Sequence, residues 1–477
     1  MRSRGRGGGR GKEEEENPLD RPIPRPRSFI DKKLHRSETG RTTMTHPPPD
    51  RATLRRATIA SVIGNGLEWF DFLVYGFFAQ TIAGVFFPAN SADLSLILTF
   101  ATFGVGFLVR PLGGILIGLY ADRAGRQKAL SLLILLMAAG TLLLGVAPGY
   151  ASSGLVGPIL VLIARILQGI SVGGEFASAT SLLVEYAPPQ RFFYYGSFQM
   201  SAQALAVALA SGMAYLLSRF LDPAALSAWG WRIPFLLGAL IGPVGFYIRR
   251  RVGEAPAFLE ARRAAPPPRA PLLVVFRDFP APLIAAIGTI VCGTAATYLW
   301  NSYLPVYVVR ALHLPITTPL LGAAICGLFY MVWSPLAGLL CDRFGPYRVF
   351  FPALIANGLL AFPLFAFVIS APGPDRLFFV QWVGTLLLGM QAAPIPALIA
   401  SYFPIPVRST GLAVAYNVSV TLFGGLAPLT MTYAMMVLKT PYVPALYLSA
   451  AAILSLVLVL GFRPLPTRLA AAQASQP

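Results

Sequence analysis

Long apolar stretches alternate with short polar loops along the chain from about residue 50 onward. About twelve of these stretches approach the roughly 20 residues that cross a bilayer as an α-helix. They lack the alternation of a β-barrel strand, and lipid offers no partner to unpaired backbone groups. The pattern predicts an all-α membrane protein with twelve transmembrane helices. The predicted spans are 57–87, 94–120, 129–147, 155–186, 193–218, 232–249, 281–309, 319–341, 349–370, 376–402, 408–437 and 442–462.

A loop motif occurs twice at matching places in this pattern. "GLYADRAGRQK" covers 118–128 and follows the second span, and "GLLCDRFGPYR" covers 338–348 and follows the eighth. The repeat predicts two homologous, pseudo-symmetric six-helix bundles, 51–249 and 281–466, that rock against each other. The organisation is typical of a transporter.

Composition and charge support a membrane location. Apolar residues make up 55% of the chain and charged residues 12%, and the mean hydropathy is +0.64, far from a soluble domain. The net charge of +18 would favour nucleic acid in a soluble protein, but here most Lys and Arg lie in alternate loops. The other loops hold only Arg219, Arg310, Arg376 and Lys439. The positive-inside rule therefore puts both termini in the cytoplasm and excludes a nucleic-acid partner.

Three segments lie outside the predicted bundles. Residues 1–50 mix Arg/Gly, Glu and Pro runs, so we expect disorder and no secretory signal, and we hypothesise that Met44 is the translation start. Residues 250–280 are rich in Arg, Pro and Ala and predict a cytoplasmic linker. Residues 467–477 form a short cytoplasmic tail.

Cysteine and histidine usage argues against an enzyme. Cys292, Cys326 and Cys341 lie in apolar spans without a pairing pattern, and His35, His46 and His313 lie outside the spans. No metal site or cofactor is expected. The sequence predicts no catalytic residues.

Charged side chains inside the spans are costly, so each requires a partner or a function. The first span carries a polar stripe at helical spacing: Asn65, Glu68, Asp71 and Tyr75. Arg110 stands before Pro111 in the second span, where it can neutralise Asp71 or Glu68. The fourth span adds a second stripe and a pair of small residues for helix packing: Arg165, Gln168, Ser171, Glu175 and Ser178, with Gly169 and Gly173.

Two interpretations fit these charges. In the first, Arg110 binds an anionic substrate and a carboxylate carries the coupling proton, with Asp71, Glu68 and Glu175 as candidates. In the second, the charges form a structural ion-pair network. A carboxylate paired with an arginine is poised to exchange a proton when the arginine turns to a bound anion. Arg165 and Gln168 are assigned to structure or coupling.

Amide and aromatic groups supply the rest of a substrate wall. Paired prolines in "GMQAAPIPAL" predict a bend in the tenth span. The predicted substrate-binding residues beside Arg110 are Gln199, Gln203, Tyr298, Asn301, Gln391 and Asn417.

"GLYADRAGRQK" resembles the loop between helices 2 and 3 of the major facilitator superfamily. The resemblance implies that Asp122 latches the cytoplasmic gate, together with Arg123, Gly125 and Arg126. In the second copy it implies the same for Asp342, Arg343 and Gly345, although Pro346 and Tyr347 replace common basic residues.

"GNGLEWFDFLVYG", "FLVRPLGG", "RILQGISVGGE" and "WGWRIPF" are similar to the metabolite:proton symporter family within that superfamily. The resemblance implies a bacterial inner-membrane symporter that works by alternating access. We expect a protein functional as a monomer that imports an organic carboxylate, such as citrate, a related di- or tricarboxylate or a keto acid like α-ketoglutarate, with protons. The alternatives are a symporter for a zwitterion such as betaine or proline, and a membrane nutrient sensor without transport.

Overall fold

The computed structural model describes Thr58 and residues 65–66, 69–114, 116–117, 126–173, 175–240 and 271–463. These residues form helices and no strands, which confirms the all-α prediction. Eight described helices are long and apolar enough to cross a membrane, and one bent pair adds a ninth. Two shorter apolar helices, Leu132–Val146 and Val156–Val172, coincide with two further predicted spans.

The first half begins with the bent pair, in which Trp69–Phe77 meets α3 (Ala79–Phe86) at 70°. Residues 233–240 are helical and belong to the predicted sixth span. The other helices of this half are α4 (Ala92–Leu108), α6 (Arg126–Val146), α7 (Tyr150–Ser153), α8 (Val156–Val172), α9 (Glu175–Tyr186), η1 (Pro189–Arg191), α10 (Phe192–Phe220), α11 (Pro223–Ala228) and η2 (Gly230–Arg232).

The second half has a π-helical turn in two of its long helices, at η3 (Leu299–Tyr303) and η4 (Thr421–Gly425). A turn at 393–394 interrupts the tenth span, where paired prolines predict a bend. The remaining helices are α14 (Pro271–Asp278), α15 (Pro280–Tyr298), α16 (Leu304–Ala311), α17 (Thr317–Phe344), α18 (Pro346–Ser370), α19 (Pro374–Ala392), α20 (Ile395–Ala400), α21 (Ile405–Val420), α22 (Ala427–Leu438) and α23 (Val443–Phe462).

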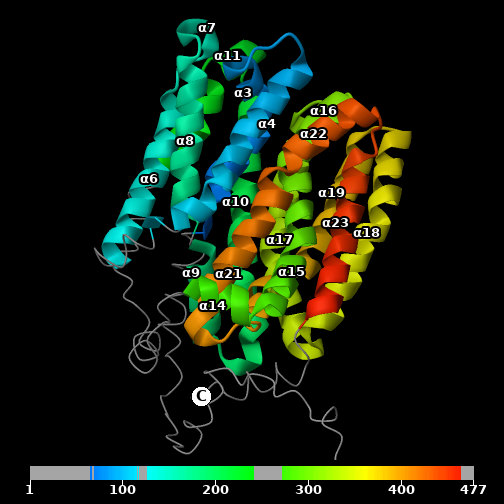
Figure 1. Ribbon diagram of the computed structural model, residues 1–477. Coiled ribbons are helices and arrows are strands. Elements are labelled where there is room, and N and C mark those ends of the chain that lie inside the picture. The colour runs from blue at the N-terminus through cyan, green and yellow to red at the C-terminus, as the bar shows by residue number, and fades with distance from the viewer. Residues whose placement is uncertain are drawn as a thin grey trace, which may run out of the picture. The chain divides into compact units, whose positions relative to one another are not determined.

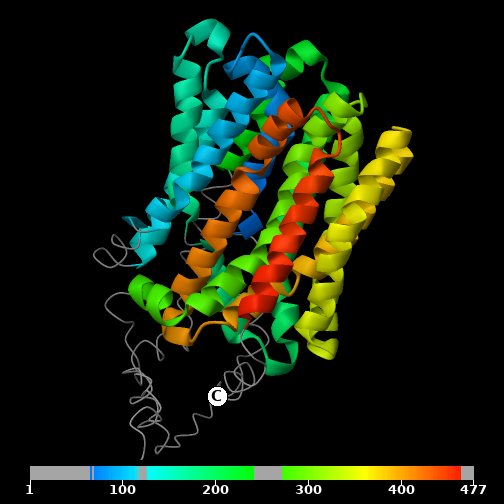
Figure 2. The ribbon, with the colours of Figure 1, turned by 45° about the vertical axis from the view of Figure 1, so that its right-hand side comes forward.

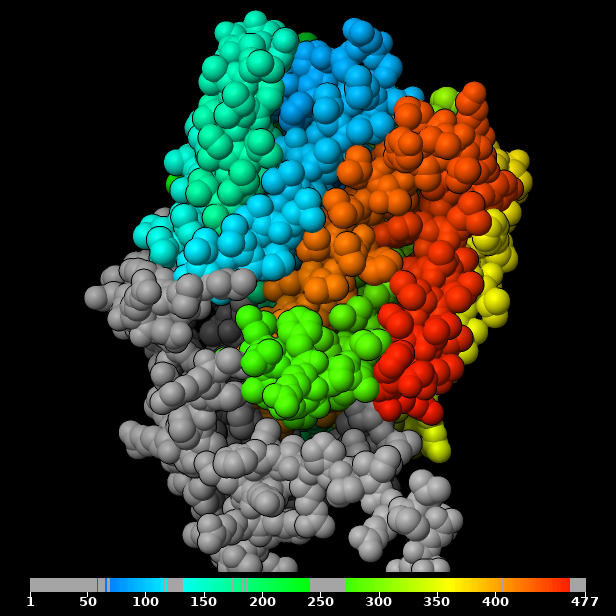
Figure 3. All heavy atoms as spheres, viewed as in Figure 1, coloured from blue at the N-terminus to red at the C-terminus, as the bar shows by residue number. Residues whose placement is uncertain are grey.

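Within the larger compact unit of the chain, the described parts of the two halves meet along several helix pairs. α10 packs on α17, and α4 packs on α22 (Figures 1 and 2). In the space-filling view α4 and α22 touch along one face (Figure 3). Ser201 Oγ donates a hydrogen bond to the Met331 carbonyl at 2.8 Å, which joins α10 to α17.

We name the two ends of the bundle by their elements. The motif end is where α17 ends and α10 begins, at the bottom of Figure 1, and the far end is where α4 begins and α16 ends.

Small residues let α8 approach α4 closely. A Cβ added at Gly169 would lie 2.1 Å from the Gly106 carbonyl oxygen, and one at Gly173 would lie 2.3 Å from the Arg110 carbonyl oxygen. Both distances are far below van der Waals contact, so a side chain at either position would force the helices apart. The predicted small-residue packing surface is confirmed, and it brings the helix Ala92–Gly114, which contains Arg110, next to α8, which contains Arg165.

Candidate functional site

Asp71 is buried in helix 69–77 at the start of a polar chain that crosses three helices. Its Oδ2 accepts a hydrogen bond from Thr141 Oγ1 of α6. Gln168 Nε2 of α8 donates to Thr141 Oγ1 at 3.0 Å. Arg165 Nη1 donates to Gln168 Oε1 at 2.9 Å. A carboxylate and a guanidinium are thus linked through two neutral side chains, which we call the relay.

Arg165 is fully buried at the other end of the relay. Its guanidinium carbon lies 3.8 Å from the centroid of the Tyr75 ring, close enough for a cation–π interaction. The Tyr75 hydroxyl donates to the Thr99 carbonyl at 3.0 Å, which holds the ring in place. The charge of Arg165 also attracts Asp71. This agrees with the sequence interpretation of Arg165 and Gln168 as structural or coupling residues, which stays a prediction.

The second oxygen of Asp71 faces the backbone of residues 233–240. A Cβ added at Gly238 would lie 2.5 Å from Asp71 Oδ1, so glycine is needed there to admit the carboxylate. Asp71 Oδ1 has no hydrogen-bond partner among the described residues. Among the described residues, only the Oδ2 atom of Asp71 is hydrogen-bonded, to Thr141.

Arg110 is also buried, but it is held by aromatic rings. Its guanidinium carbon lies 4.1 Å from the Phe107 ring centroid and 4.8 Å from that of Phe72. Within the described part of the chain, its Nε and Nη1 have no hydrogen-bond acceptor. Two buried donors on a fixed cation are suited to a carboxylate ligand.

Of the two carboxylates that Arg110 could neutralise, the described Asp71 forms no salt bridge with Arg110 in this conformation. The reason is helical geometry, since neighbouring residues point about 100° apart. Phe72 contacts Arg110, while Asp71 is directed to α6 and α8. The other candidate partner, Glu68, lies outside the described residues.

Tyr298 reaches the same aromatic cluster from the second half. Its ring centroid lies 5.6 Å from that of Phe107, at a nearly perpendicular angle, and 5.8 Å from that of Trp69. The predicted wall residue Tyr298 therefore lies beside the rings that hold Arg110.

Gln199 and Gln203 are buried one turn apart on α10. The Nε2 and Oε1 atoms of Gln199 and Nε2 of Gln203 lack partners among the residues the structure describes. Asn65 Nδ2 donates to the Gln199 carbonyl at 3.1 Å. The site thus gains a buried amide from the first helix that the sequence pattern did not assign to binding, although its place in the polar stripe was the signal.

Asn301 lines a cavity of about 20 Å³ between the halves. Its Nδ2 donates to the Thr297 carbonyl at 2.8 Å. Trp300 Nε1 and Gln381 Oε1 are buried beside the cavity without partners in the described chain. Sequence reasoning missed Gln381. The signal that could have identified it is its polar amide side chain inside the apolar tenth span.

The two remaining amides do not join this group. Gln391 Oε1 accepts from Asn357 Nδ2 at 2.8 Å and from Cys292 Sγ at 3.5 Å, inside the core of the second half. Asn417 Nδ2 donates to the Gly173 carbonyl at 2.7 Å and bridges α21 to α8. Gln391 has the position of a core residue, and Asn417 that of a contact between the halves.

At the motif end, Asp342 of α17 caps the start of α10. Its carboxylate accepts from the backbone N–H groups of Phe193 at 2.9 Å and Tyr194 at 3.0 Å. A carboxylate is stabilised at a helix N-terminus by the unpaired N–H groups and the helix dipole. This bridge joins the two halves.

The other predicted gate residues are described only in part. Arg343 lies 5.3 Å from the Phe344 ring centroid, and Gly345 has φ +89°, which ends α17. Asp122, Arg123 and Gly125 lie outside the described residues, and Arg126 and Glu175 begin α6 and α9 with side chains that are not described.

We expect Asp342→Asn to open the motif end. Hydrogen bonds to a charged group contribute about 1.5–3 kcal/mol, so the open fraction should rise roughly tenfold or more. Cys341 is buried on the α17 face that also carries Gly338, which contacts α10. Its alkylation rate by a permeant maleimide should therefore increase. Buried Cys292 is the internal control, and Asp375→Asn in the first turn of α19 is the matched variant. Equal Cys341 rates in the variants and the parent would contradict the expectation.

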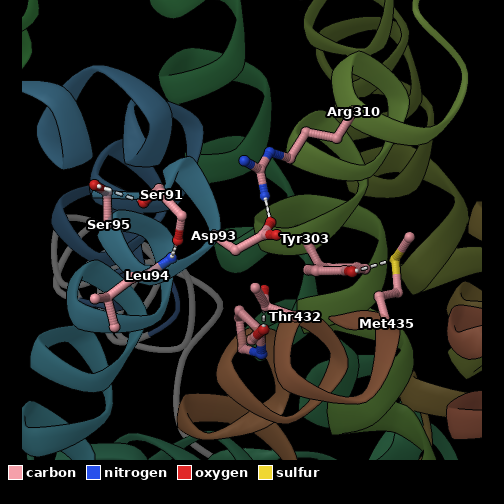
Figure 4. A network of polar contacts seen from close by, with 9 residues as sticks. Ser91, Asp93, Leu94, Ser95, Tyr303, Arg310, Thr432 and Met435 are labelled. Carbon is pink, nitrogen blue, oxygen red and sulfur yellow. Dashed lines mark hydrogen bonds and ion pairs between the residues drawn. The ribbon is translucent and has the colours of Figure 1, made fainter. Parts of the chain in front are cut away.

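At the far end, Asp93 and Arg310 form an ion pair between the halves (Figure 4). Asp93 lies in the first turn of α4, which begins with Ser91 accepting from the Leu94 N–H. Tyr303 lies nearby and donates to Met435 Sδ at 2.8 Å. The Asp93 and Arg310 side chains are 48% and 30% exposed, so water and salt screen the pair.

Loss of this pair should loosen the far end modestly. Exposed pairs contribute about 0.2–1 kcal/mol, so Asp93→Asn or Arg310→Gln should raise the open fraction up to about fivefold. Spin labels on exposed Asn90 and Lys439 would report the distance between the halves. The charge-swapped double variant should recover most of the closed population, and no recovery would mean that the pair itself is not responsible.

Comparisons with known proteins identify the family to which the chain belongs. The two halves of membrane-spanning helices, joined at both ends, define a polytopic helical membrane protein. The profile of the Major Facilitator Superfamily matches residues 62–428, so the chain belongs to that superfamily. It is 37% identical over 421 residues to a citrate-proton symporter of Klebsiella pneumoniae, covering 87% of this chain and 94% of the relative.

Two further similarities bear on substrate and fold. The chain is 34% identical to the glycine betaine/proline/ectoine/pipecolic acid transporter OusA of Dickeya dadantii, covering 85% of this chain and 83% of the relative. The structure of the xylose transporter XylE from E. coli, in a partially occluded inward open conformation, matches with a TM-score of 0.68 at 18% identity. That match covers 86% of this chain and all of XylE, and shows the fold.

Proposed function

We propose that the protein is a proton-coupled symporter that imports an organic carboxylate by alternating access. The observation that carries the proposal is Arg110, a buried cation with two donors lacking acceptors in the described chain, in the same half as a buried carboxylate. The citrate-proton symporters at 37% and 35% identity support a carboxylate as substrate.

Arg110 is assigned to the substrate anion. The rings of Phe72 and Phe107 fix its guanidinium, so little side-chain entropy is lost when a carboxylate binds. Gln199 and Gln203 provide amide groups without partners among the described residues, and Tyr298 and Asn301 provide the opposite wall.

Asp71 is assigned to the proton, with Glu68 and Glu175 as the other candidates. Its burial and its link to Arg165 through Thr141 and Gln168 support this role. Protonation removes a buried negative charge and thereby weakens the electrostatic attraction between Asp71 and Arg165.

We further propose the topology that alternating access requires. The bundles are 51–249 and 281–466, the linker is 250–280, and the motif end with both termini faces the cytoplasm of a bacterial inner membrane. Asp342 then closes the cytoplasmic side, and the ion pair of Asp93 with Arg310 closes the outer side.

The proposal is tested in liposomes that contain a pH-sensitive dye. Citrate, α-ketoglutarate, shikimate, betaine and proline are added separately without an imposed gradient. Acidification of the lumen by one carboxylate and not by the zwitterions would support the proposal. Stabilisation of the protein by a ligand without acidification would favour the nutrient sensor instead.

A zwitterionic substrate is the second candidate. OusA and the putative proline/betaine transporters of Staphylococcus aureus are 34% identical to the chain. The aromatic cluster of Trp69, Phe107 and Tyr298 favours it, because aromatic faces attract quaternary ammonium groups. Acidification by betaine or proline alone would select this candidate.

A further inference from the structure

We propose that Thr141 sets the pH at which Asp71 loads its proton, by turning its single hydroxyl hydrogen between Asp71 and the Met137 carbonyl. The inference rests on the proposed proton-coupled function and assigns a positioning residue to it. Thr141 was not among the residues that the sequence pattern singled out.

Arg165, at one end of the relay, determines which atom is the donor in the hydrogen bonds that follow. Arg165 is only a donor, so the atom of Gln168 that it contacts at 2.9 Å must be the amide oxygen. The Gln168 amide nitrogen therefore faces Thr141 and donates to its hydroxyl oxygen at 3.0 Å. The Thr141 hydroxyl hydrogen is thus not used by Gln168.

Two acceptors compete for that hydrogen. One is Asp71 Oδ2 and the other is the Met137 carbonyl oxygen, 3.0 Å from Thr141 Oγ1 on the preceding turn of α6. When Asp71 is ionised, the hydroxyl donates to the carboxylate, and this charge-assisted bond is the stronger. When Asp71 is protonated on Oδ2, its own O–H donates to Thr141 and the hydroxyl hydrogen turns to Met137. A hydroxyl has one hydrogen and two lone pairs, so Gln168 keeps its bond in both states.

Few other groups compete with Thr141 for control of Asp71. Arg165 from α8 attracts the carboxylate, and Tyr75 on the same helix as Asp71 contacts Arg165. From residues 233–240 the carboxylate meets the Gly238 position, which carries no side chain. Among the described residues, Thr141 is the one side chain that donates directly to Asp71.

The second half contains a neutral counterpart. The repeated loops are 220 residues apart, from Gly118 to Gly338, and the corresponding helices α15, α18 and α19 contribute Cys292, Asn357 and Gln391. These three are joined at the Gln391 oxygen. Polar contacts among these helices thus exist without a carboxylate. The relay of the first half differs by having a titratable group, Asp71, and a hydroxyl, that of Thr141, which can either donate a hydrogen bond to that group or accept one from it.

The test is a pH titration of the reconstituted full-length protein by infrared difference spectroscopy. The carboxylic-acid C=O band that disappears in Asp71→Asn identifies Asp71. Thr141→Val has nearly the same shape as threonine but cannot donate, so the midpoint should move to higher pH by about one unit or more. Thr141→Ser keeps the hydroxyl and should stay near the parent, and Thr141→Cys, a weak donor, should lie between them.

The series separates control of the proton by the Thr141 hydroxyl from a purely structural role of this residue. A structural brace alone would change thermal stability without ordering the midpoints as serine, cysteine and valine. An unchanged midpoint in Thr141→Val, or equal shifts in the serine and valine variants, would overturn the inference. The titration needs no substrate, so a protein that titrates as expected but fails to acidify liposomes would overturn the proposed function alone.

Discussion

Arg110→Ala should reduce carboxylate uptake by roughly thirtyfold or more. Removal of one member of a buried, hydrogen-bonded charge pair costs about 2–5 kcal/mol, and each 1.4 kcal/mol is tenfold in affinity. Most of the loss should fall on KM, because the proposed role of the guanidinium is to bind the anion and not to transfer the proton. Uptake of labelled citrate or the substrate found in the liposome screen, measured against concentration, would give both constants.

Two further variants test whether the loss is specific to the Arg110 guanidinium: Arg110→Lys and, as a control, Arg376→Ala. Lysine keeps the charge but loses the planar fork that stacks on Phe107 and binds a carboxylate with two hydrogen bonds, so an intermediate loss is expected. Arg376 is exposed and bonds within its own half, to the Phe367 carbonyl and the Ser370 hydroxyl. An Arg110→Ala protein with an unchanged KM would remove Arg110 from the binding site.

Asp71→Asn should separate substrate movement from proton movement. Asparagine can still accept from Thr141, but it cannot bind and release a proton at neutral pH. At a pH difference of one unit, the parent should accumulate substrate up to about tenfold per coupled proton, and the variant should reach equal concentrations on both sides. Exchange of labelled substrate across the membrane should persist.

The control for Asp71 is a carboxylate of the same type elsewhere. Asp375→Asn removes an exposed acid from the first turn of α19 and should leave accumulation unchanged. If Asp71→Asn still moved protons with substrate, the proton site would have to be another carboxylate.

Sequence reasoning located the buried charges but not all of their partners. Hydropathy and helical spacing identify Asp71, Arg110 and Arg165, because a charge inside an apolar span is visible in one dimension. The partner of Asp71 depends on how each helix is rotated about its axis. This rotation cannot be predicted from the sequence when a helix is apolar on all its faces. Thr141 was therefore missed, since a threonine in an apolar helix usually bonds its own backbone, as Thr141 also does to Met137.

The contacts between the halves were predictable only in part. The repeated loop indicated Asp342, but its partners are backbone N–H groups of α10. Nearly every residue type has a backbone N–H group, so these partners cannot be recognised from the side chains in the sequence. The ion pair of Asp93 with Arg310 joins residues 217 positions apart near the ends of two helices, where charges are common and carry little information. Gln391 and Asn301 are both buried amides, and only their surroundings separate a core position from a cavity wall.

The bridges at the two ends are formed at the same time. Asp342 holds the motif end and Asp93 the far end in a single conformation, with Asp71 buried between them. In this conformation Asp71 is only 4% exposed, so the proposed proton site has little contact with water. A carrier that held this conformation without substrate would not dissipate the proton-motive force, so the two proposed gates would also prevent proton leakage when substrate is scarce.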